Sequence, residues 1–376
     1  MTYAIFQTIM VYGLLTIIMF ILFKESYRQK KNSYTIYALL IYSVIFGLRY
    51  CVGVDYMSYV VMYEKVASGI DVEKEFGFVG LMKFFSALGL GIEWFFAFCA
   101  FFQLFFIFQL FKSQKDILPY LILTFMMSGE MVNYSNIIRN MFAFAIVVYS
   151  LKYIQNKSPL KHYFWLFVAF SIHKSCAIMV VLYPLYMLKS EYFKNRLMQY
   201  GLLVVSLVLM NLNYIQEFIA QTDSLMALLG YNEKYILDDR MDQKVSIGLG
   251  FIIELAIACT IIYYSPKAKE HYAKLPINIM YDLFVVGLVI KYSFIGSLFI
   301  QRMNTYFIGY TFILAAMEYA CMRKTKIVKG RYILLGLYCM LAFSILYRMV
   351  ENSAMFIFDF QDDLFYLKNE FRAKEL

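Results

Sequence analysis

Charged residues are scarce in this chain. They make up 16% of its 376 residues, whereas an ordinary water-soluble domain carries about 25%. Hydrophobic residues reach 62%, the mean hydropathy is +0.62, and no hydrophilic stretch is long enough to form a separate soluble domain. The composition therefore excludes an ordinary soluble enzyme and indicates a single integral-membrane domain over residues 1–376.

Histidine and paired cysteines are also scarce. Three histidines cannot build a histidine-rich metal site, and the six cysteines stand in or beside apolar runs without CxxC spacing. We expect no metal, no cofactor and no disulfide. The signatures HExxH, GxSxG and the Walker loop are missing, which excludes the enzyme classes that carry them.

The net charge of +9 would suggest nucleic acid as a partner of a soluble protein. Here the basic residues lie in short loops between apolar runs, where membrane topology requires them. We therefore expect membrane lipid, and no nucleic acid, around this chain.

Apolar runs recur along the whole sequence and predict an all-α transmembrane helix bundle of about 12 spans, since a spanning helix needs roughly 20 apolar residues. The first run is too long for a signal peptide core. Two short neighbours, 162–173 and 175–188, suggest a broken or re-entrant hairpin. The runs cover residues 3–23, 34–48, 92–111, 117–132, 137–154, 162–173, 175–188, 197–213, 246–264, 277–295, 303–321 and 332–349.

More than half of the lysines and arginines fall in six short loops, which we place in the cytoplasm by the positive-inside rule. These loops are 24–33, 112–116, 152–161, 189–196, 265–276 and 322–331. Segments 49–91, 133–140, 214–245 and 352–376 then face the periplasm. Within the first of these, 76–91 is expected to be an amphipathic or re-entrant outer-face helix, and a true span is the alternative.

Five ionisable residues stand at predicted outer helix ends: Arg49, Asp55, Arg139, His173 and Arg302. An arginine near lipid must snorkel, pair or line a wet cavity. Several guanidinium forks opening into one cavity would bind phosphate oxygens well. Each residue also has a structural interpretation, since a lone arginine can be an anchor, a lone histidine a packing residue and a lone aspartate a helix cap.

Four stretches resemble, in the same order, motifs of the EpsG-like proteins, which belong with the Wzy-type polysaccharide polymerases. They are LRYCVGVDYMSY, the glutamate–glycine segment EFGFVGLMKFFSALGLG, the pair NIIRNMFAFAIVVYSLKYI and VAFSIHKSCAIMVVLYPLY, and the late RMNTYF. The resemblance covers roughly residues 40–310. One departure is Asn140, which follows Arg139 where the family often has glutamine.

The resemblance implies a bacterial inner-membrane glycosyltransferase of polysaccharide biosynthesis (O-antigen, capsule or exopolysaccharide), with its active site facing the periplasm. It would transfer a growing glycan from undecaprenyl diphosphate to the sugar of an incoming lipid-linked repeat. A chain-length regulator and a flippase of the same pathway are further implied partners. The implied catalytic residues are His173, as general base, with Arg49, Arg139 and Arg302 on the pyrophosphate, and the implied substrate-binding residues are Asp55, Tyr56, Tyr59, Asn140 and Tyr306.

Two other classes stay open from sequence. A lipid-linked oligosaccharide flippase would also use many spans and broken helices, although the chain shows no internal repeat and its charges gather on one side. An O-antigen ligase-like glycan transferase or an acyltransferase could use similar arginine and histidine chemistry. His162 and His271 lie in predicted cytoplasmic loops, so they are poor candidates for an outer-face base.

Overall fold

The structure is a computed structural model that describes residues 2–50, 52–53, 55–210, 248–294 and 298–351. The secondary structure of the described residues consists of helices and contains no β-strand, which confirms the all-α prediction. The predicted periplasmic loop 214–245 and the tail 352–376 lie outside the described residues.

The chain divides into two compact units. Unit 1 comprises Met1–Ser150, Tyr163–Ala177 and Leu341–Leu376, and unit 2 comprises Leu151–His162 and Ile178–Met340. The single membrane domain expected from the sequence stays a prediction.

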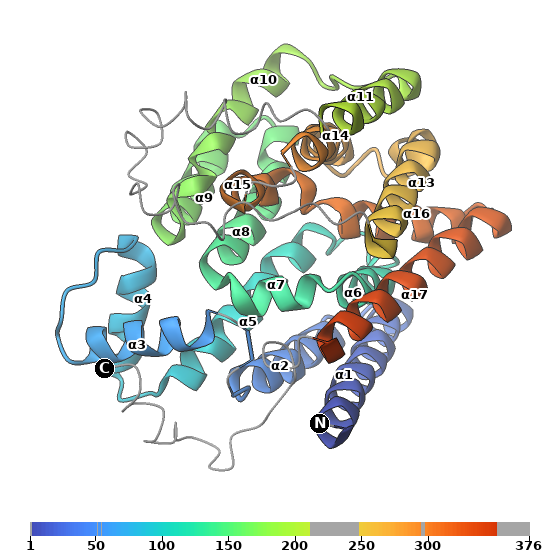
Figure 1. Cartoon of the computed structure of the whole chain (residues 1–376). Helices are drawn as coiled ribbons and strands as arrows, with labels where there is room; N and C mark the ends of the chain where they lie inside the picture. The colour runs from blue at the N-terminus through green and yellow to red at the C-terminus, as the bar shows by residue number, and fades with distance from the viewer. Residues whose placement is uncertain (1, 51, 54, 211–247, 295–297, 352–376) are drawn as a thin grey trace. The chain divides into compact units, whose positions relative to one another are not determined.

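Unit 1 is built on four helices that pack as neighbours, α1 with α2 and α6, and α2 with α5 (Figure 1). The helices that lie wholly in this unit are α1 (Thr2–Gln29), α2 (Ser33–Gly47), α3 (Tyr56–Ala67), α4 (Phe76–Ala87), α5 (Ile92–Leu110), α6 (Leu118–Met127) and α7 (Glu130–Asn136). It also contains most of α8 (Ile138–Gln155) and of α9 (Pro159–Ile172), and the start of the 3₁₀ helix η1 (Lys174–Val181).

Helices α2 and α5 approach each other closely at Gly47. A Cβ on this glycine would lie 2.6 Å from the Cβ of Ala97 and 2.9 Å from the carbonyl oxygen of Glu93. The Ser43 hydroxyl donates to the Ala97 carbonyl at 2.7 Å. The end of α2 therefore meets the start of α5, and the two helices run antiparallel.

Helices α3 and α4 pack side by side and precede α5 (Figure 1). The Tyr63 hydroxyl of α3 donates to the Leu90 carbonyl at 2.7 Å and so ties the pair to the turn before α5. Helix α4 has 12 residues, about 18 Å at the usual rise, whereas the hydrocarbon core is about 30 Å thick. Its length agrees with the expectation that segment 76–91 does not span.

A sharp break separates α7 from α8. The two helices differ in direction by 117°, and Ile137 between them has φ −91° and ψ 58°. A break frees backbone carbonyls, which must find partners where lipid surrounds the protein. The Gln103 side chain of α5 donates to the carbonyls of Tyr134 and Ile138, at 3.2 and 3.1 Å. The buried amide thus stabilises the break.

Unit 2 contains α10 (Leu182–Leu188), α11 (Arg196–Leu209), α13 (Leu249–His271), α14 (Ile277–Ser293), α15 (Leu298–Ile308), α16 (Thr311–Lys324) and most of α17 (Val328–Glu351). Helix α14 packs on α11 and α15, and α13 packs on α16. At Gly287, a Cβ would lie 2.5 Å from the backbone nitrogen of Ile308, so glycine permits the α14–α15 contact. The Asp282 carboxylate accepts from the backbone N–H groups of Tyr192 and Phe193 and fixes the loop after α10.

Four described helices are long and apolar enough to cross a membrane, or five if the bent α7–α8 pair counts as one span. A bundle of about 12 spans is therefore not confirmed. The single helix predicted over 303–321 is wrong, because α15 ends at Ile308 and α16 begins at Thr311. The predicted break between 162–173 and 175–188 is confirmed, since α9 ends at Ile172 and η1 begins at Lys174.

Candidate functional site

A cluster of charged side chains in unit 1 is centred on Glu75, the residue that precedes α4. One carboxylate oxygen, Oε2, lies 2.7 Å from a guanidinium nitrogen of Arg139. The other oxygen, Oε1, lies 2.8 Å from Nδ1 of His173 and 3.4 Å from the backbone nitrogen of Lys174. We call Glu75, Arg139 and His173 the Glu75 cluster. The carboxylate joins the arginine and the histidine that the sequence singled out.

Local backbone features bring these three residues together. Arg139 stands in the first turn of α8, directly after the α7–α8 break, and His173 stands between the end of α9 and the start of η1. Each side chain thus projects from a helix end. Glu75 reaches His173 because α4 lies against the last turn of α9: a Cβ on Gly77 would lie 2.3 Å from the Ser171 hydroxyl oxygen and 2.8 Å from the Ser171 carbonyl oxygen.

The side chains of the Glu75 cluster are partly exposed at the protein surface. The side chains of Arg139 and His173 are 21% and 18% exposed, and that of Glu75 is 9% exposed. Burial alone raises the pKa of the Glu75 carboxyl, but the His173 hydrogen bond and the Arg139 guanidinium outweigh burial and hold this pKa well below its usual range. Glu75 is therefore a carboxylate at any physiological pH.

An ionised Glu75 decides how a neutral His173 is oriented. A carboxylate only accepts hydrogen bonds, so Nδ1 of the imidazole must donate to it. The other ring nitrogen, Nε2, then carries the lone pair and can accept a proton. The Glu75 carboxylate therefore binds two groups. One is the His173 imidazole, which can accept a proton at Nε2, and the other is the positively charged guanidinium of Arg139.

Aromatic residues surround the Arg139 side of the cluster. The Arg139 guanidinium interacts electrostatically with Tyr59 of α3 and lies over the Phe78 ring at 6.0 Å from its centroid. Tyr59 is buried and contacts both Phe78 and Phe96. The predicted substrate-binding residue Tyr59 thus lies beside the cluster.

Arg49 occupies a different environment in unit 1. It is 2% exposed, and its guanidinium donates to the carbonyls of Phe46 and, at 3.0 Å, of Ser135. It lies over the Phe96 ring at 4.3 Å from the centroid, and the adjoining cavity has only about 10 Å³. In this conformation Arg49 caps backbone carbonyls at the end of α2 and before the α7–α8 break. A role on pyrophosphate stays a prediction.

The other predicted residues of unit 1 lie near these two arginines. Tyr56 is buried, and its ring centroid lies 5.6 Å from the Arg49 guanidinium. Asp55 is half-buried before α3, and its backbone N–H donates to the Asn136 side chain at 2.9 Å. Gly53, two residues before Asp55, has φ +102°, a conformation that favours glycine. Asn140 is buried in the first turn of α8.

The two remaining predicted residues belong to unit 2. Arg302 is exposed on α15, and Tyr306, one turn later, is fully buried. Within the described ranges, no group of three or more histidine, cysteine, aspartate or glutamate side chains could hold a metal ion. The structure therefore brings together Arg139, His173 and Tyr59, with Arg49 and Tyr56 forming a second contact in the same unit.

Sequence reasoning did not assign Glu75 a role, although it is the residue that joins the cluster. The signal was present in the stretch EFG, where a glutamate stands two residues before a glycine at a helix start. Its partners lie 64 and 98 residues away along the chain, so no local pattern identifies them.

The long apolar helices and the Glu75 cluster define a helical membrane protein with a charged site at helix ends. The chain belongs to the EpsG family, whose model matches residues 33–361. No curated protein and no solved structure matches the chain. The family match includes every predicted site residue and confirms the resemblance seen in the sequence.

Proposed function

We propose that this protein is a polysaccharide polymerase of the Wzy type. It transfers a growing glycan from undecaprenyl diphosphate to a sugar hydroxyl of an incoming lipid-linked repeat, on the periplasmic face of the bacterial inner membrane. Membership of the EpsG family supports a polymerase role. The single observation that carries the proposal is the Glu75 cluster, which holds a proton acceptor and a guanidinium on one carboxylate.

The reaction breaks the bond between the anomeric carbon and the pyrophosphate oxygen and forms a bond from that carbon to the acceptor oxygen. The bonding electrons leave with the pyrophosphate, and the acceptor proton passes to Nε2 of His173. Glu75 stabilises the imidazolium that results. General-base catalysis of this kind is typically worth about 10²–10⁴-fold in rate.

Positive charge aimed at the leaving pyrophosphate stabilises the charge that grows on it in the transition state. Arg139 is partly exposed and can exchange Glu75 for a phosphate oxygen when substrate binds. Arg49 and Arg302 are the further proposed pyrophosphate ligands. Asp55, Tyr56, Tyr59, Asn140 and Tyr306 are proposed to bind the sugars and the lipid-linked diphosphate, since aromatic faces and polar tips suit carbohydrate.

The topology belongs to the same proposal, with about 12 spans and with segments 49–75 and 133–140 in the periplasm. Single cysteines introduced into each segment are expected to react with a membrane-impermeant maleimide in intact spheroplasts. A cysteine in the predicted cytoplasmic loop 322–331 serves as the control that reacts only after lysis. Protection of both outer segments would contradict the topology.

A chromosomal deletion tests the function itself. The surface glycan of the deletion strain is separated on a gel and compared with strains that carry the wild type or His173→Ala. Loss of the long ladder with a single repeat remaining supports a polymerase. Loss of all outer-face repeats would indicate a flippase instead, and normal polymer that is no longer attached to its final acceptor would indicate a ligase-like transferase.

A further inference from the structure

A cavity at the other end of unit 1 has no part in the proposed reaction. It has a volume of about 170 Å³ and lies between the start of α2, the end of α5 and the start of α6. A water molecule occupies about 30 Å³ in the liquid, so the cavity has room for a group much larger than one water. Its lining residues are Asn32, Thr35, Ile36, Leu39, Phe105, Phe108, Gln109, Lys112, Lys115 and Leu118. We call it the Lys112–Lys115 pocket.

The lining is divided between basic and apolar groups. Lys112 and Lys115 come from the turn between α5 and α6, and no acidic residue stands among the described residues that line the pocket. The rest of the lining is mainly apolar, and the side chains of Leu39, Phe108 and Leu118 are buried. The pocket therefore combines a cationic part with a hydrocarbon part.

The two lysines have no carboxylate partner within the described residues. Burial lowers the pKa of Lys115, and the neighbouring charge of Lys112 lowers it further. Asp116 follows Lys115 but is buried and does not line the pocket. An anion placed between the two ammonium groups would relieve their repulsion.

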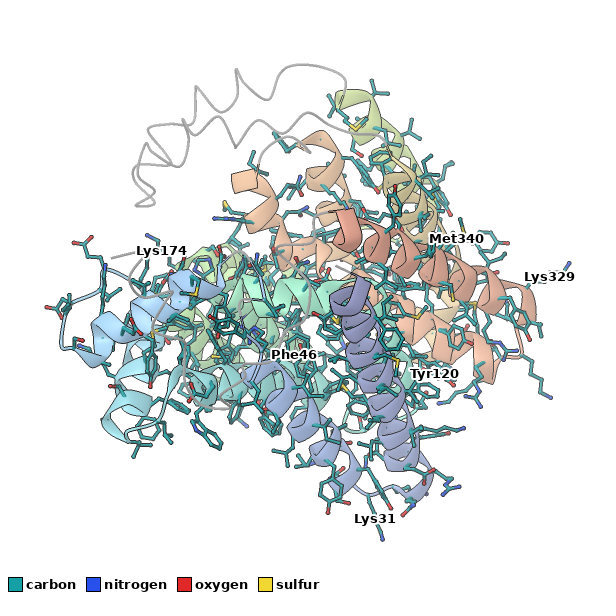
Figure 2. The ribbon with its side chains drawn as sticks, turned by 60° about the horizontal axis from the view of Figure 1, so that its bottom comes forward. Lys31, Phe46, Tyr120, Lys174, Lys329 and Met340 are labelled. Carbon is teal, nitrogen blue, oxygen red and sulfur yellow. The ribbon has the colours of Figure 1, made fainter. Side chains whose placement is uncertain are left out.

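The position of the pocket indicates where its ligand comes from. It lies at the ends of α2 and α5 that adjoin the α1–α2 turn, where Figure 2 shows Lys31. Segment 24–33, which contains the end of α1 and the α1–α2 turn, carries Lys24, Arg28, Lys30 and Lys31. The sequence predicts that this segment and segment 112–116 face the same membrane surface. Basic pockets between helices at such a surface bind anionic lipid headgroups.

We propose that the Lys112–Lys115 pocket binds an anionic phospholipid of the cytoplasmic leaflet. Lys112 and Lys115 bind the phosphodiester, the amide groups of Asn32 and Gln109 donate to its oxygens, and an acyl chain follows the apolar lining beside Leu39. The bound lipid holds the end of α2 against the end of α5. This site is separate from the Glu75 cluster and does not depend on the proposed polymerase reaction.

The test uses the full-length protein, purified in a mild detergent and supplied with equal amounts of phosphatidylglycerol and phosphatidylcholine. Native mass spectrometry then counts the lipids that remain bound. Wild type is expected to retain phosphatidylglycerol preferentially, and Lys112→Ala/Lys115→Ala to lose this preference by about fivefold for each lysine. The matched control is Lys161→Ala/Lys329→Ala, which removes two exposed lysines of other predicted cytoplasmic loops and should retain the lipid as wild type does.

A second variant separates the pocket from general surface charge. Ile36→Trp leaves both lysines in place but fills the apolar part, so it too should lose phosphatidylglycerol. Equal retention by wild type and by both pocket variants would overturn the proposal. In a further arm, inorganic phosphate alone is titrated calorimetrically into the wild type. Binding of free phosphate as tight as that of the lipid would assign the pocket to a soluble anion and would also overturn it.

Discussion

Two arginines of unit 1, Arg49 and Arg139, were assigned the same role from the sequence but occupy different environments. Arg49 is almost fully buried, and it donates to main-chain carbonyls that no helix satisfies. Arg139 is partly exposed, and it pairs with a carboxylate that it shares with a histidine. A guanidinium can therefore stabilise a broken backbone in one place and hold a charged site ready for a ligand in another.

The difference lies in what each arginine would lose on binding a phosphate. If Arg49 turned toward a ligand, it would leave buried carbonyls without donors, at a cost of about 1–3 kcal/mol for each group. If Arg139 turned toward a ligand, Glu75 would still have His173 as a partner. Arg139 is thus the better placed of the two to exchange partners during a reaction, and Arg49 the better placed to fix the site.

The largest expected effect is on the rate of glycan transfer and not on folding. His173→Ala should reduce glycan transfer by about 10²–10⁴-fold while the purified protein stays folded, because the histidine is at a helix end in partial contact with solvent and Glu75 keeps Arg139 as a partner. Transfer is measured with purified lipid-linked repeats, and donor binding is measured separately.

His173→Gln sharpens the same test. Glutamine can hydrogen-bond Glu75 but cannot take up a proton, so its activity should also be lost. If glutamine restored the rate, His173 would only orient the acceptor, and the base would have to be sought elsewhere, with Asp55 the next candidate.

The second effect is expected on stability. Arg49→Ala leaves the carbonyls of Phe46 and Ser135 without donors and should lower the free energy of unfolding by about 2–4 kcal/mol. Arg49→Lys should recover only part of this loss, because one ammonium group cannot reproduce the planar fork. The measurement is thermal unfolding in detergent, with Arg139→Ala as the comparison, which should lose less stability because Glu75 keeps His173 as a partner. Equal melting temperatures for Arg49→Ala and the wild type would remove the distinction between the two arginines.

Much of the helical framework could be predicted from the sequence. Runs of about 20 apolar residues predicted the bounds of α5, α8 and α14 to within about two residues, because such runs have few other stable conformations in lipid. Breaks inside apolar runs were harder to find. The run 117–132 is interrupted at Gly129, which has φ +74°, and hydropathy does not respond to a backbone angle.

Two members of the Glu75 cluster could be singled out from the sequence, but their connection through Glu75 could not. Arg139 and His173 stood out because charged groups at apolar helix ends require an explanation. Their connection through Glu75 depends on contacts between segments far apart in the chain, as does the capping role of Arg49. Sequence patterns report local periodicity and composition, and they contain no direct record of such contacts.

The third prediction concerns Glu75 itself. Glu75→Gln removes the carboxylate but keeps an amide that can accept from one partner, so transfer should fall by about 10–100-fold, less than for His173→Ala. The pH dependence of stability supplies a second measurement. Because the folded pKa of Glu75 is depressed, the Glu75 carboxylate stabilises the folded protein. This stabilisation is fully present above the unfolded pKa of about 4.3 and is lost progressively as the pH falls from that value toward the folded pKa.

Between about pH 5 and pH 3 the free energy of unfolding of the wild type should therefore fall as the pH is lowered. That of Glu75→Gln should fall less. Arg49→Lys, which changes no carboxylate, provides the control and should keep the wild-type pH dependence. Identical pH profiles for wild type and Glu75→Gln would show that the ion pairs of the cluster contribute nothing to the folded state.

The smallest expected effect tests how the cluster is positioned. Gly77→Ala places a methyl group 2.3 Å from the Ser171 hydroxyl oxygen and 2.8 Å from its carbonyl oxygen. The α4–α9 contact must then open, at a cost of about 1–3 kcal/mol, and Glu75 moves away from His173. Transfer should fall by about 5–10-fold. The matched control is Gly80→Ala in the same helix, where a Cβ meets nothing within 4 Å and where alanine should be neutral or slightly stabilising. If the two variants behaved alike, the close approach at Gly77 would have no part in holding Glu75 against His173.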